Sequence, residues 1–258
     1  MLEIRNLSAG YNGNMVLRDL SLSIPRGSVT VIVGPNGCGK STLLKALAGI
    51  LPATGSAALD GRELLGLDRG EWAKVVAFLP QNRPVPEIAV KNLVLHGRFP
   101  YLSYPRRYRR EDYRAAEVAL ERMGIAELSE RTLPTLSGGQ RQKVYIAMAL
   151  AQDTPVVLMD EPNAFLDIAH QLQLMEQAKA LAEEGKTVVL VLHDLTLALD
   201  WADFLAVVYN GQCLFRGRAE EVYLSGCLET AFSVQVQRVQ TTDGWKYYFS
   251  NKRLRKTE

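Results

Sequence analysis

A glycine-rich segment near the N-terminus holds the residues best suited to chemistry. From Gly34 to Ser41 it fits the pattern G-x-x-x-x-G-K-[ST] without a gap. Its glycines let successive backbone N–H groups face phosphate oxygens at the positive end of a helix. Lys40 would then reach the β- and γ-phosphates, and the Ser41 hydroxyl would bind Mg²⁺. A glycine turn beside a solvated lysine is the alternative, but the full pattern favours a nucleotide site. The phosphate-binding segment comprises Gly34, Pro35, Asn36, Gly37, Cys38, Gly39, Lys40, Ser41 and Thr42.

The residues around this segment predict the elements that position it. An apolar run, Val29 to Val33, comes before the first glycine and indicates a buried strand. Apolar residues between Leu43 and Ala48 indicate a buried helix, and Gly49 is its expected end. A strand, a tight loop and a helix are the context that a phosphate-binding pattern requires.

Two acidic residues, Asp160 and Glu161, follow another apolar run, Val156 to Met159. Ligands of an open parallel sheet bind at the carboxyl ends of its strands. Asp160 is suited to hold Mg²⁺, directly or through water, and Glu161 to polarise the water that attacks the γ-phosphate. Two acids after a strand are often only a helix N-terminus. Together with the phosphate-binding segment, they favour hydrolysis of the nucleotide.

A second helix start also suits an anion. Ser137, Gly138, Gly139 and Gln140 precede an apolar helical run, which predicts a serine cap and free backbone N–H groups. An ordinary capped helix is the alternative. Two such helix starts for one nucleotide suggest a shared site, in which this one serves the nucleotide of a neighbouring copy.

Composition places the chain among ordinary globular proteins. Its 258 residues are 47% apolar and 22% charged, which allows one large core with a smaller inserted subdomain. A net charge of +2 gives no support to nucleic acid as a partner. Three widely spaced cysteines favour a reducing compartment over a disulfide framework. Neither a signal-peptide pattern nor an apolar run of ~18–20 residues is present, so we expect another chain to span any membrane involved.

Strand and helix patterns alternate along the chain, which predicts a doubly wound parallel sheet in an α/β fold. Half-buried strands are expected at Leu2–Leu7 and Leu20–Ile24, with a loop over 9–14 between them. Helical periodicity predicts an inserted subdomain at about 81–152, within a single domain of 1–258 whose core is 1–80 and 153–258. The other expected elements are strands at 54–61, 75–79 and 187–192, helices at 68–74 and 168–184, and hairpins turning at Asn210-Gly211 and Asp243-Gly244.

Taken in order, these motifs resemble the ATP-binding subunit of an ABC transporter. The resemblance extends from the first strand to about residue 230 and includes Gln81, Leu166-Asp167 and His193. It implies a P-loop NTPase core with a parallel sheet, an antiparallel β subdomain and the inserted α-helical subdomain. It also implies two copies stacked head to tail around two ATP molecules, with each phosphate-binding segment facing Ser137-Gly138-Gly139 of the other copy.

Further roles follow from the resemblance alone. Tyr11 lies where the family stacks an aromatic ring on adenine, and Asp167 matches a loop that communicates across the dimer. Gln81 lies where a glutamine meets Mg²⁺ and the attacking water, and His193 where a histidine contacts the γ-phosphate. Taken alone, Tyr11 would be ordinary packing and His193 a strand-end residue. The implied catalytic residues are Glu161, Gln81 and His193, and the implied Mg²⁺ ligands are Ser41, Gln81 and Asp160.

The chain departs from the family pattern at a few positions. Asn163 replaces a threonine, and Ala164-Phe165 replaces Ser-Ala, although an aromatic residue recurs there in importer subfamilies. Cys38 stands where Ser or Ala is common. Its setting at a helix N-terminus predicts a lowered thiol pKa, and therefore that alkylation of Cys38 blocks ATP binding.

Three segments narrow the resemblance to importers of iron-siderophores, haem and cobalamin: Val90–Tyr101, Arg141–Gln152 and Leu166–Gln171. Such importers pair two ATPase chains with polytopic membrane permease subunits and an external substrate-binding protein. The resemblance implies an ATPase that uses ATP and Mg²⁺ at the cytoplasmic face of the cell membrane to drive uptake of a metal chelate. The alternatives are an importer ATPase for another substrate, or a soluble ABC ATPase of translation or DNA repair.

Two basic stretches carry weaker signals. The arginines between Arg106 and Arg110 are either a solvated helix start or a contact with an acidic partner or lipid headgroups. The basic tail at 252–256 predicts no function.

Overall fold

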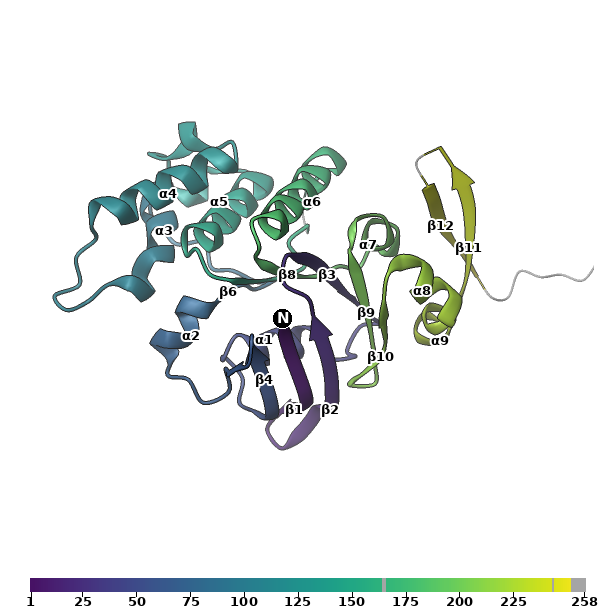
Figure 1. The fold of residues 1–258 in the computed structure, drawn as a ribbon. Coiled ribbons are helices and arrows are strands. Elements are labelled where there is room, and N and C mark those ends of the chain that lie inside the picture. Colours follow the sequence, from purple (N-terminus) through teal and green to yellow (C-terminus); the bar gives the residue numbers. More distant parts are fainter. Residues whose placement is uncertain (164–165, 243, 252–258) are drawn as a thin grey trace, which may run out of the picture.

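The computed structural model describes residues 1–163, 166–242 and 244–251 (Figure 1). The Ala164-Phe165 departure, Asp243 of the second hairpin turn and the basic tail lie outside these residues. The described strands form a six-stranded, a four-stranded and a two-stranded sheet.

The six-stranded sheet has the order β10-β9-β3-β8-β7-β6. Adjacent strands from β9 to β6 pair in parallel, whereas β10 is antiparallel to β9. The predicted parallel sheet of an α/β fold is therefore confirmed. Its strands are β3 (Ser28–Val33), β6 (Val76–Leu79), β7 (Val156–Asp160), β8 (Thr187–Val191), β9 (Phe204–Tyr209) and β10 (Gln212–Gly217).

Both faces of this sheet are covered, which is why its central strands are mostly apolar without alternation. All residues of β3, β7 and β8 are buried. Side chains of β3 alternate between two hydrophobic clusters, with Val31 in one and Ile32 in the other. Helices α5 and α6 lie on one side of the sheet, and α1 and the four-stranded sheet on the other (Figure 1). The α-helices are α1 (Lys40–Leu47), α2 (Arg69–Val75), α3 (Val90–Leu95), α4 (Arg110–Arg122), α5 (Gly138–Ala151), α6 (Ile168–Glu183), α7 (Leu195–Trp201), α8 (Ala219–Ser225) and α9 (Cys227–Phe232).

The four-stranded sheet is antiparallel and has the order β2-β1-β4-β5. Its strands are β1 (Leu2–Tyr11), β2 (Asn14–Ile24), β4 (Ala53–Leu59) and β5 (Arg62–Glu63). The expected loop over 9–14 is wrong, because Ala9 pairs with Leu17 and Tyr11 with Asn14. Only Asn12 and Gly13 turn the chain, with φ angles of 50° and 82°. Positive φ at both positions is what a two-residue hairpin turn requires.

The segment between β6 and β7 is helical, apart from one isolated bridge between Ala89 and Thr132. It contains α3, α4 and α5 and three 3₁₀ turns, η1 (His96–Tyr101), η2 (Ala126–Leu128) and η3 (Leu133–Thr135). We propose that these elements form the inserted subdomain expected at about 81–152, since β6 ends at Leu79 and β7 begins at Val156.

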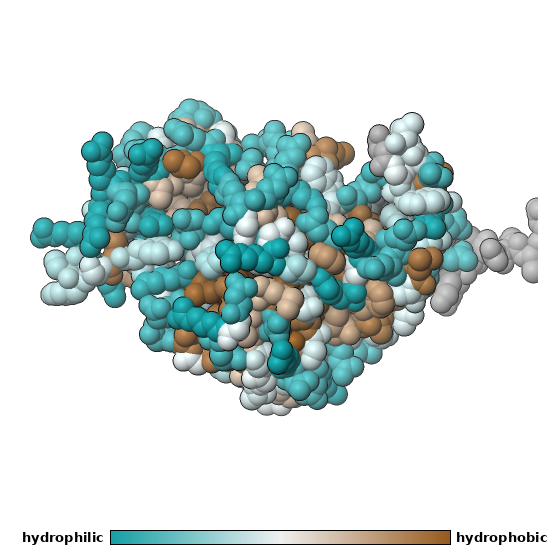
Figure 2. Space-filling model, in the orientation of Figure 1, coloured by the Kyte–Doolittle hydropathy of each residue, from teal (hydrophilic) through white to brown (hydrophobic). Residues whose placement is uncertain are grey.

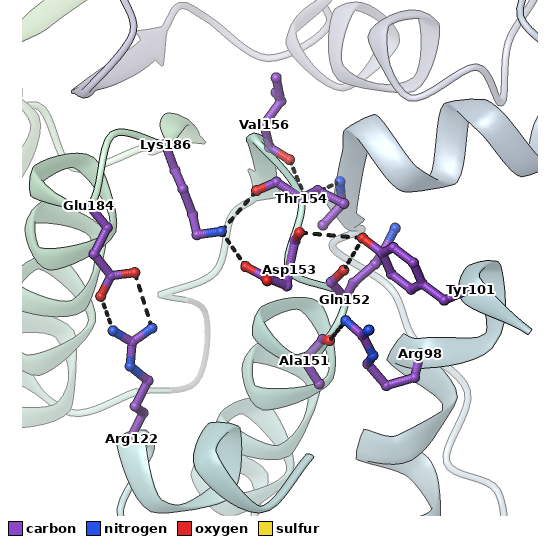
Figure 3. Close-up of polar contacts among 11 residues, drawn as sticks. Arg98, Tyr101, Arg122, Ala151, Gln152, Asp153, Thr154, Val156, Glu184 and Lys186 are labelled. Atoms are coloured by element: carbon purple, nitrogen blue, oxygen red, sulfur yellow. Dashed lines mark hydrogen bonds and ion pairs between the residues drawn. The ribbon is translucent and has the colours of Figure 1, made fainter. Parts of the chain in front are cut away.

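Polar contacts attach this helical segment where α5 returns to the sheet (Figure 3). Arg98 donates to the Ala151 carbonyl at 3.1 Å, and the Tyr101 hydroxyl to that of Gln152 at 2.8 Å. On the sheet side, Lys186 donates to Asp153 at 2.6 Å. An ion pair between Arg122 and Glu184 ties the end of α4 to the residue that follows α6.

The C-terminal part adds the predicted hairpins. β9 and β10 meet at Asn210 and Gly211, as expected, and β11 (Val234–Thr241) pairs with β12 (Gly244–Asn251). The face drawn in Figure 2 is mostly hydrophilic, with hydrophobic residues in smaller patches. Among the described residues, no helix combines the length and the apolar character that a membrane crossing requires.

Candidate functional site

The expected site residues gather at one edge of the six-stranded sheet. The phosphate-binding segment follows β3, and His193 comes two residues after β8. Asp160 is the last residue of β7, Glu161 follows it, and Gln81 comes two residues after β6. These four strands are neighbours in the order β3-β8-β7-β6. Parallel strands place their carboxyl ends at the same edge, which is the usual ligand edge of such sheets.

The phosphate-binding segment is tightly packed against the protein at Gly34 and Gly39, whereas Gly37 faces open space. A Cβ at Gly34 would collide with the Val208 carbonyl, and one at Gly39 would approach Leu17 Cδ2 to 2.6 Å. At Gly37, where φ is 78°, a Cβ would meet no atom within 4 Å. Gly39 has a φ of 110° and is the N-cap residue of α1. The loop therefore needs glycine for its turn and for its close approach to Val208 and Leu17, and the open space at Gly37 suits a phosphate group.

Lys40 is buried, with 6% of its surface exposed. Its ammonium donates to the carbonyl oxygens of Gly34 at 2.7 Å and Pro35 at 3.0 Å. The loop thus holds its own lysine by hydrogen bonds, which occupy two of the three N–H groups of the ammonium.

Asp160 lies at the end of β7 with 2% exposure. Its Oδ1 is a buried atom without a hydrogen-bond partner in the part of the chain that the structure describes. Burial raises the pKa of Asp160, and a hydrogen bond from the Ser41 side chain opposes this rise. A buried, incompletely paired carboxylate beside a serine hydroxyl is a hard oxygen donor set that fits Mg²⁺.

Glu161 gathers the other two expected catalytic side chains on its carboxylate. Gln81 Nε2 donates to Oε2 at 2.5 Å, and His193 Nε2 lies 2.5 Å from Oε1. Glu161 also has a φ of 50°. The other described non-glycine residues with positive φ are Asn, Asp or Ser, so Glu161 stands out as a side chain that rarely adopts this conformation. Strain of this kind is concentrated at functional positions.

The second helix start is a complete capping box. Ser137 Oγ accepts from the Gln140 N–H at 3.2 Å, and Gln140 Oε1 accepts from the Ser137 N–H at 3.0 Å. Ser137, Gly139 and Gln140 border a hollow of about 480 Å³, together with residues from the α6 start and from Gly124 to Leu128. No residue of the phosphate-binding segment borders this hollow, so the two helix starts do not share it in one chain.

Three other expected residues have local partners. Tyr11 ends β1 with 41% exposure, and the Lys45 ammonium lies 5.8 Å from its ring centroid. Asp167 caps α6 by accepting from the His170 N–H at 2.9 Å. Arg109 is the N-cap residue of α4, where its N–H donates to the Asp112 carboxylate at 2.8 Å. The last contact favours the helix-start interpretation of the arginine cluster.

The expected low pKa of Cys38 is wrong. Burial of the thiol, 6% exposed, raises its pKa and outweighs the lowering effects of Lys40 and the helix N–H groups. The argument from the helix N-terminus considered only local dipoles, whereas desolvation under the loop is the larger effect.

Two residues next to the site were not anticipated. Arg83 and Gln142 hydrogen-bond to each other at 2.5 Å although they are 59 positions apart. The nearest sequence signal was the buried face of the helix after Ser137, which predicts burial of position 142 but no partner.

Comparisons with known proteins agree with the resemblance. Residues 17–164 match a family model described as ABC transporter. The chain is 41% identical over 238 residues to the achromobactin transport ATP-binding protein CbrD of Dickeya dadantii (strain 3937), covering 91% of this chain and 88% of that protein. It is 40% identical over 232 residues to the ferric enterobactin transport ATP-binding protein FepC of Escherichia coli (strain K12), covering 89% and 86%. It is also 40% identical over 244 residues to the hemin import ATP-binding protein HmuV of Gloeobacter violaceus (strain ATCC 29082 / PCC 7421), covering 91% and 88%.

Solved structures show the same similarity. A chain of an ABC transporter assigned to the metal-chelate type, in an inward-facing conformation, matches with a TM-score of 0.81 and 27% identity, covering 96% of each chain. A dimeric bacterial ABC transporter cassette matches with a TM-score of 0.74 and 28% identity, covering 85% of this chain and 99% of that one.

Proposed function

Because this chain belongs to the ABC transporter family of ATP-binding proteins, we propose that it is the ATP-hydrolysing subunit of an importer for metal chelates. Relatives named for achromobactin, ferric enterobactin and hemin transport support siderophores and haem as the class of cargo. Cobalamin remains a member of the expected class.

One observation carries the hydrolytic role: Gln81, Glu161 and His193 are in contact at the edge of the sheet where the phosphate-binding segment follows β3. These residues come from three separate parts of the chain. Their convergence supplies a carboxylate, an amide and an imidazole within hydrogen-bond reach, which is what water activation beside a γ-phosphate requires.

Binding of ATP begins at the phosphate-binding segment. The backbone N–H groups around Gly37 face the phosphates, and Lys40 exchanges the Gly34 and Pro35 carbonyls for phosphate oxygens. Asp160 and Ser41 would hold Mg²⁺, with Gln81 as a further ligand. When bound, Mg²⁺ supplies positive charge to the phosphate oxygens.

Hydrolysis needs Glu161 to accept a hydrogen bond from the attacking water. Both of its oxygens are engaged here, one by Gln81 and one by His193. We therefore propose that nucleotide draws His193 away toward the γ-phosphate, which frees one oxygen for water while Gln81 keeps its hydrogen bond to the other oxygen.

A second copy of the chain completes the site. The hollow bordered by Ser137, Gly139 and Gln140 includes no residue of this chain's own phosphate-binding segment. The dimeric cassette that this chain resembles supports pairing of two copies. We propose a head-to-tail dimer in which the Ser137 helix start of each copy binds the phosphates of the other copy's ATP.

Coupling to transport requires membrane permease subunits, and an external substrate-binding protein would deliver the cargo. Import relatives support permeases as partners. We propose that the protein is peripheral, at the cytoplasmic face of the cell membrane, and that Tyr11 stacks on adenine.

Co-expression with candidate permeases tests this proposal. We expect the chain to co-purify with a polytopic membrane protein, and the complex in vesicles to hydrolyse ATP faster when a chelate-loaded binding protein is added. Recovery with ribosomes or DNA would identify a non-transport ATPase. Stimulation only by a different class of cargo would overturn the chelate assignment.

A further inference from the structure

Gln142 is a buried amide placed between two functional segments. It lies on α5 with 6% exposure. Its Nε2 donates to the Pro162 carbonyl, and its Oε1 accepts from Arg83 Nη1 at 2.5 Å. Pro162 directly follows Glu161, and Arg83 lies two residues after Gln81. One side chain therefore joins the peptide next to the catalytic carboxylate to the segment that carries its glutamine partner.

Arg83 fixes the other side of the Gln81 segment. Its Nε donates to the Pro80 carbonyl at 2.7 Å. Because Gln81 lies between Pro80 and Arg83 in the chain, this hydrogen bond closes a short loop around the glutamine. The guanidinium lies 5.2 Å from the ring centroid of Tyr145, and the Tyr145 hydroxyl donates to the Pro84 carbonyl. The Arg83–Pro80 hydrogen bond thus closes this segment around the glutamine, and Arg83 and Pro84 attach the segment to α5.

The guanidinium is kept in this place at an electrostatic cost. Burial lowers the pKa of Arg83 to about 10, with Tyr145 and Asp160 opposing that fall, so the side chain remains charged at neutral pH. Its hydrogen bonds go to a backbone carbonyl and an amide oxygen. Apolar side chains of similar volume would fill such a position at lower cost, so packing alone does not account for the Arg83–Gln142 pair.

We propose that Arg83 and Gln142 are positioning residues, which hold Gln81 against Glu161 and connect this contact to α5. The proposal rests on ATP hydrolysis through Glu161 and is independent of the cargo. Gln142 lies five residues after Ser137, or about 7.5 Å along the same helix. Phosphates of a partner's ATP held at Ser137 would therefore act, through α5, on this chain's own Gln81–Glu161 contact.

The test measures basal ATP hydrolysis by the purified full chain with Arg83→Met, Gln142→Met and the double variant. Each single variant should lower kcat about 10- to 100-fold, because small misplacements of catalytic groups have effects of this size. ATP affinity, measured with a fluorescent nucleotide, should stay within about twofold, since neither side chain faces the phosphates. The double variant should be no slower than the slower single variant, because the two residues act as one unit.

Lys91→Met is the matched control. It removes a cation of the same helical segment, which pairs with Glu130 at the surface, and it should keep the wild-type kcat. If the Met variants fold poorly, Tyr145→Phe removes only the hydroxyl contact to Pro84 and should still lower kcat with unchanged affinity.

An unchanged kcat in folded Arg83→Met and Gln142→Met would overturn the positioning role. So would equal losses in kcat and affinity, or losses that multiply in the double variant. Full hydrolysis by Glu161→Gln would instead overturn the assignment of Glu161 itself, so the two failures can be told apart.

Discussion

Glu161 accepts a hydrogen bond from Gln81 and contacts His193, so its carboxylate organises the site before nucleotide arrives. Glu161→Gln keeps the shape of the side chain but removes the charge that polarises water. We expect ATP binding to persist and turnover to stop, which would leave a nucleotide-bound dimer. Size-exclusion chromatography with ATP, beside a phosphate-release assay, checks both expectations. Free monomers in saturating ATP would contradict the shared site.

Lys40 has a second testable role. Lys40→Ala removes one charge-assisted phosphate contact worth roughly 1.5–3 kcal/mol, so ATP affinity should fall about 10- to 100-fold. Isothermal titration with ATP measures this change, with Lys91→Ala as a surface control. Binding at wild-type affinity would show that the ammonium stays on the Gly34 and Pro35 carbonyls.

Asp160 links stability to pH. Its pKa is raised by burial, so above that pKa the folded state holds an ionised, desolvated carboxylate that the unfolded chain exposes to water. Asp160→Asn removes this cost, and the nucleotide-free variant should melt at a higher temperature than the wild type at pH 7.5. The gain should shrink as pH falls through the raised pKa and vanish below the ordinary value of about 4, where both states are protonated.

Thermal melts across pH test this expectation, with the exposed Glu117→Gln as control. Asp160→Asn should also lose the added stability that Mg²⁺ with ATP gives the wild type. A variant that melts lower than the wild type at every pH would refute the electrostatic account.

At the scale of elements, the packing of η1 on α4 within the helical segment depends on a buried ion pair. Arg98 and Asp112 have side chains only 13% and 4% exposed, with Arg98 Nε 3.1 Å from Asp112 Oδ1. Arg98→Met leaves the Asp112 carboxylate buried without this partner, which should lower the free energy of unfolding by about 3–5 kcal/mol. Urea denaturation measures the loss. Lys91→Met breaks an exposed pair instead, and should change stability by at most about 1 kcal/mol. Equal losses in the two variants would contradict the role of burial.

The sequence predicted best those elements whose signals are local. The strand before Gly34 and the helix that ends near Gly49 are each marked by an apolar run and by a glycine directly after that run. The β1–β2 hairpin was placed less well, although Asn12-Gly13 is a strong turn signal. Pairing of Ala9 with Leu17 extends both strands into the expected loop, and such pairing is decided by long-range register rather than by local propensity.

The same distinction explains the site. The phosphate-binding segment and the acids after β7 are contiguous motifs, so their types and spacing sufficed. The Arg83–Gln142 contact joins segments that are separate in sequence, and only the docking of α5 brings them together. Cys38 was misjudged because burial is a property of the whole fold.

At the scale of the whole molecule, the separation of the two helix starts predicts complementation between damaged copies. At ATP concentrations near the wild-type Kd, Lys40→Ala and Ser137→Arg should each leave homodimers almost inactive, since both sites of either dimer are damaged. In a mixed dimer, one site contains both the Lys40→Ala and the Ser137→Arg substitutions. The other site contains the unchanged Lys40 of one copy and the unchanged Ser137 of the other. Mixing the two inactive proteins should therefore restore part of the ATPase activity in a phosphate-release assay. Mixtures that stay inactive while heterodimers form would argue against shared sites.

The left-handed backbone conformation of Glu161 sets thermal stability against ATP hydrolysis in this protein. Glycine at position 161 would relieve the conformation at a gain on the order of 1 kcal/mol, and it would also delete the carboxylate. A library sorted only for heat resistance should accordingly enrich glycine there, while growth that depends on the transporter should purge it.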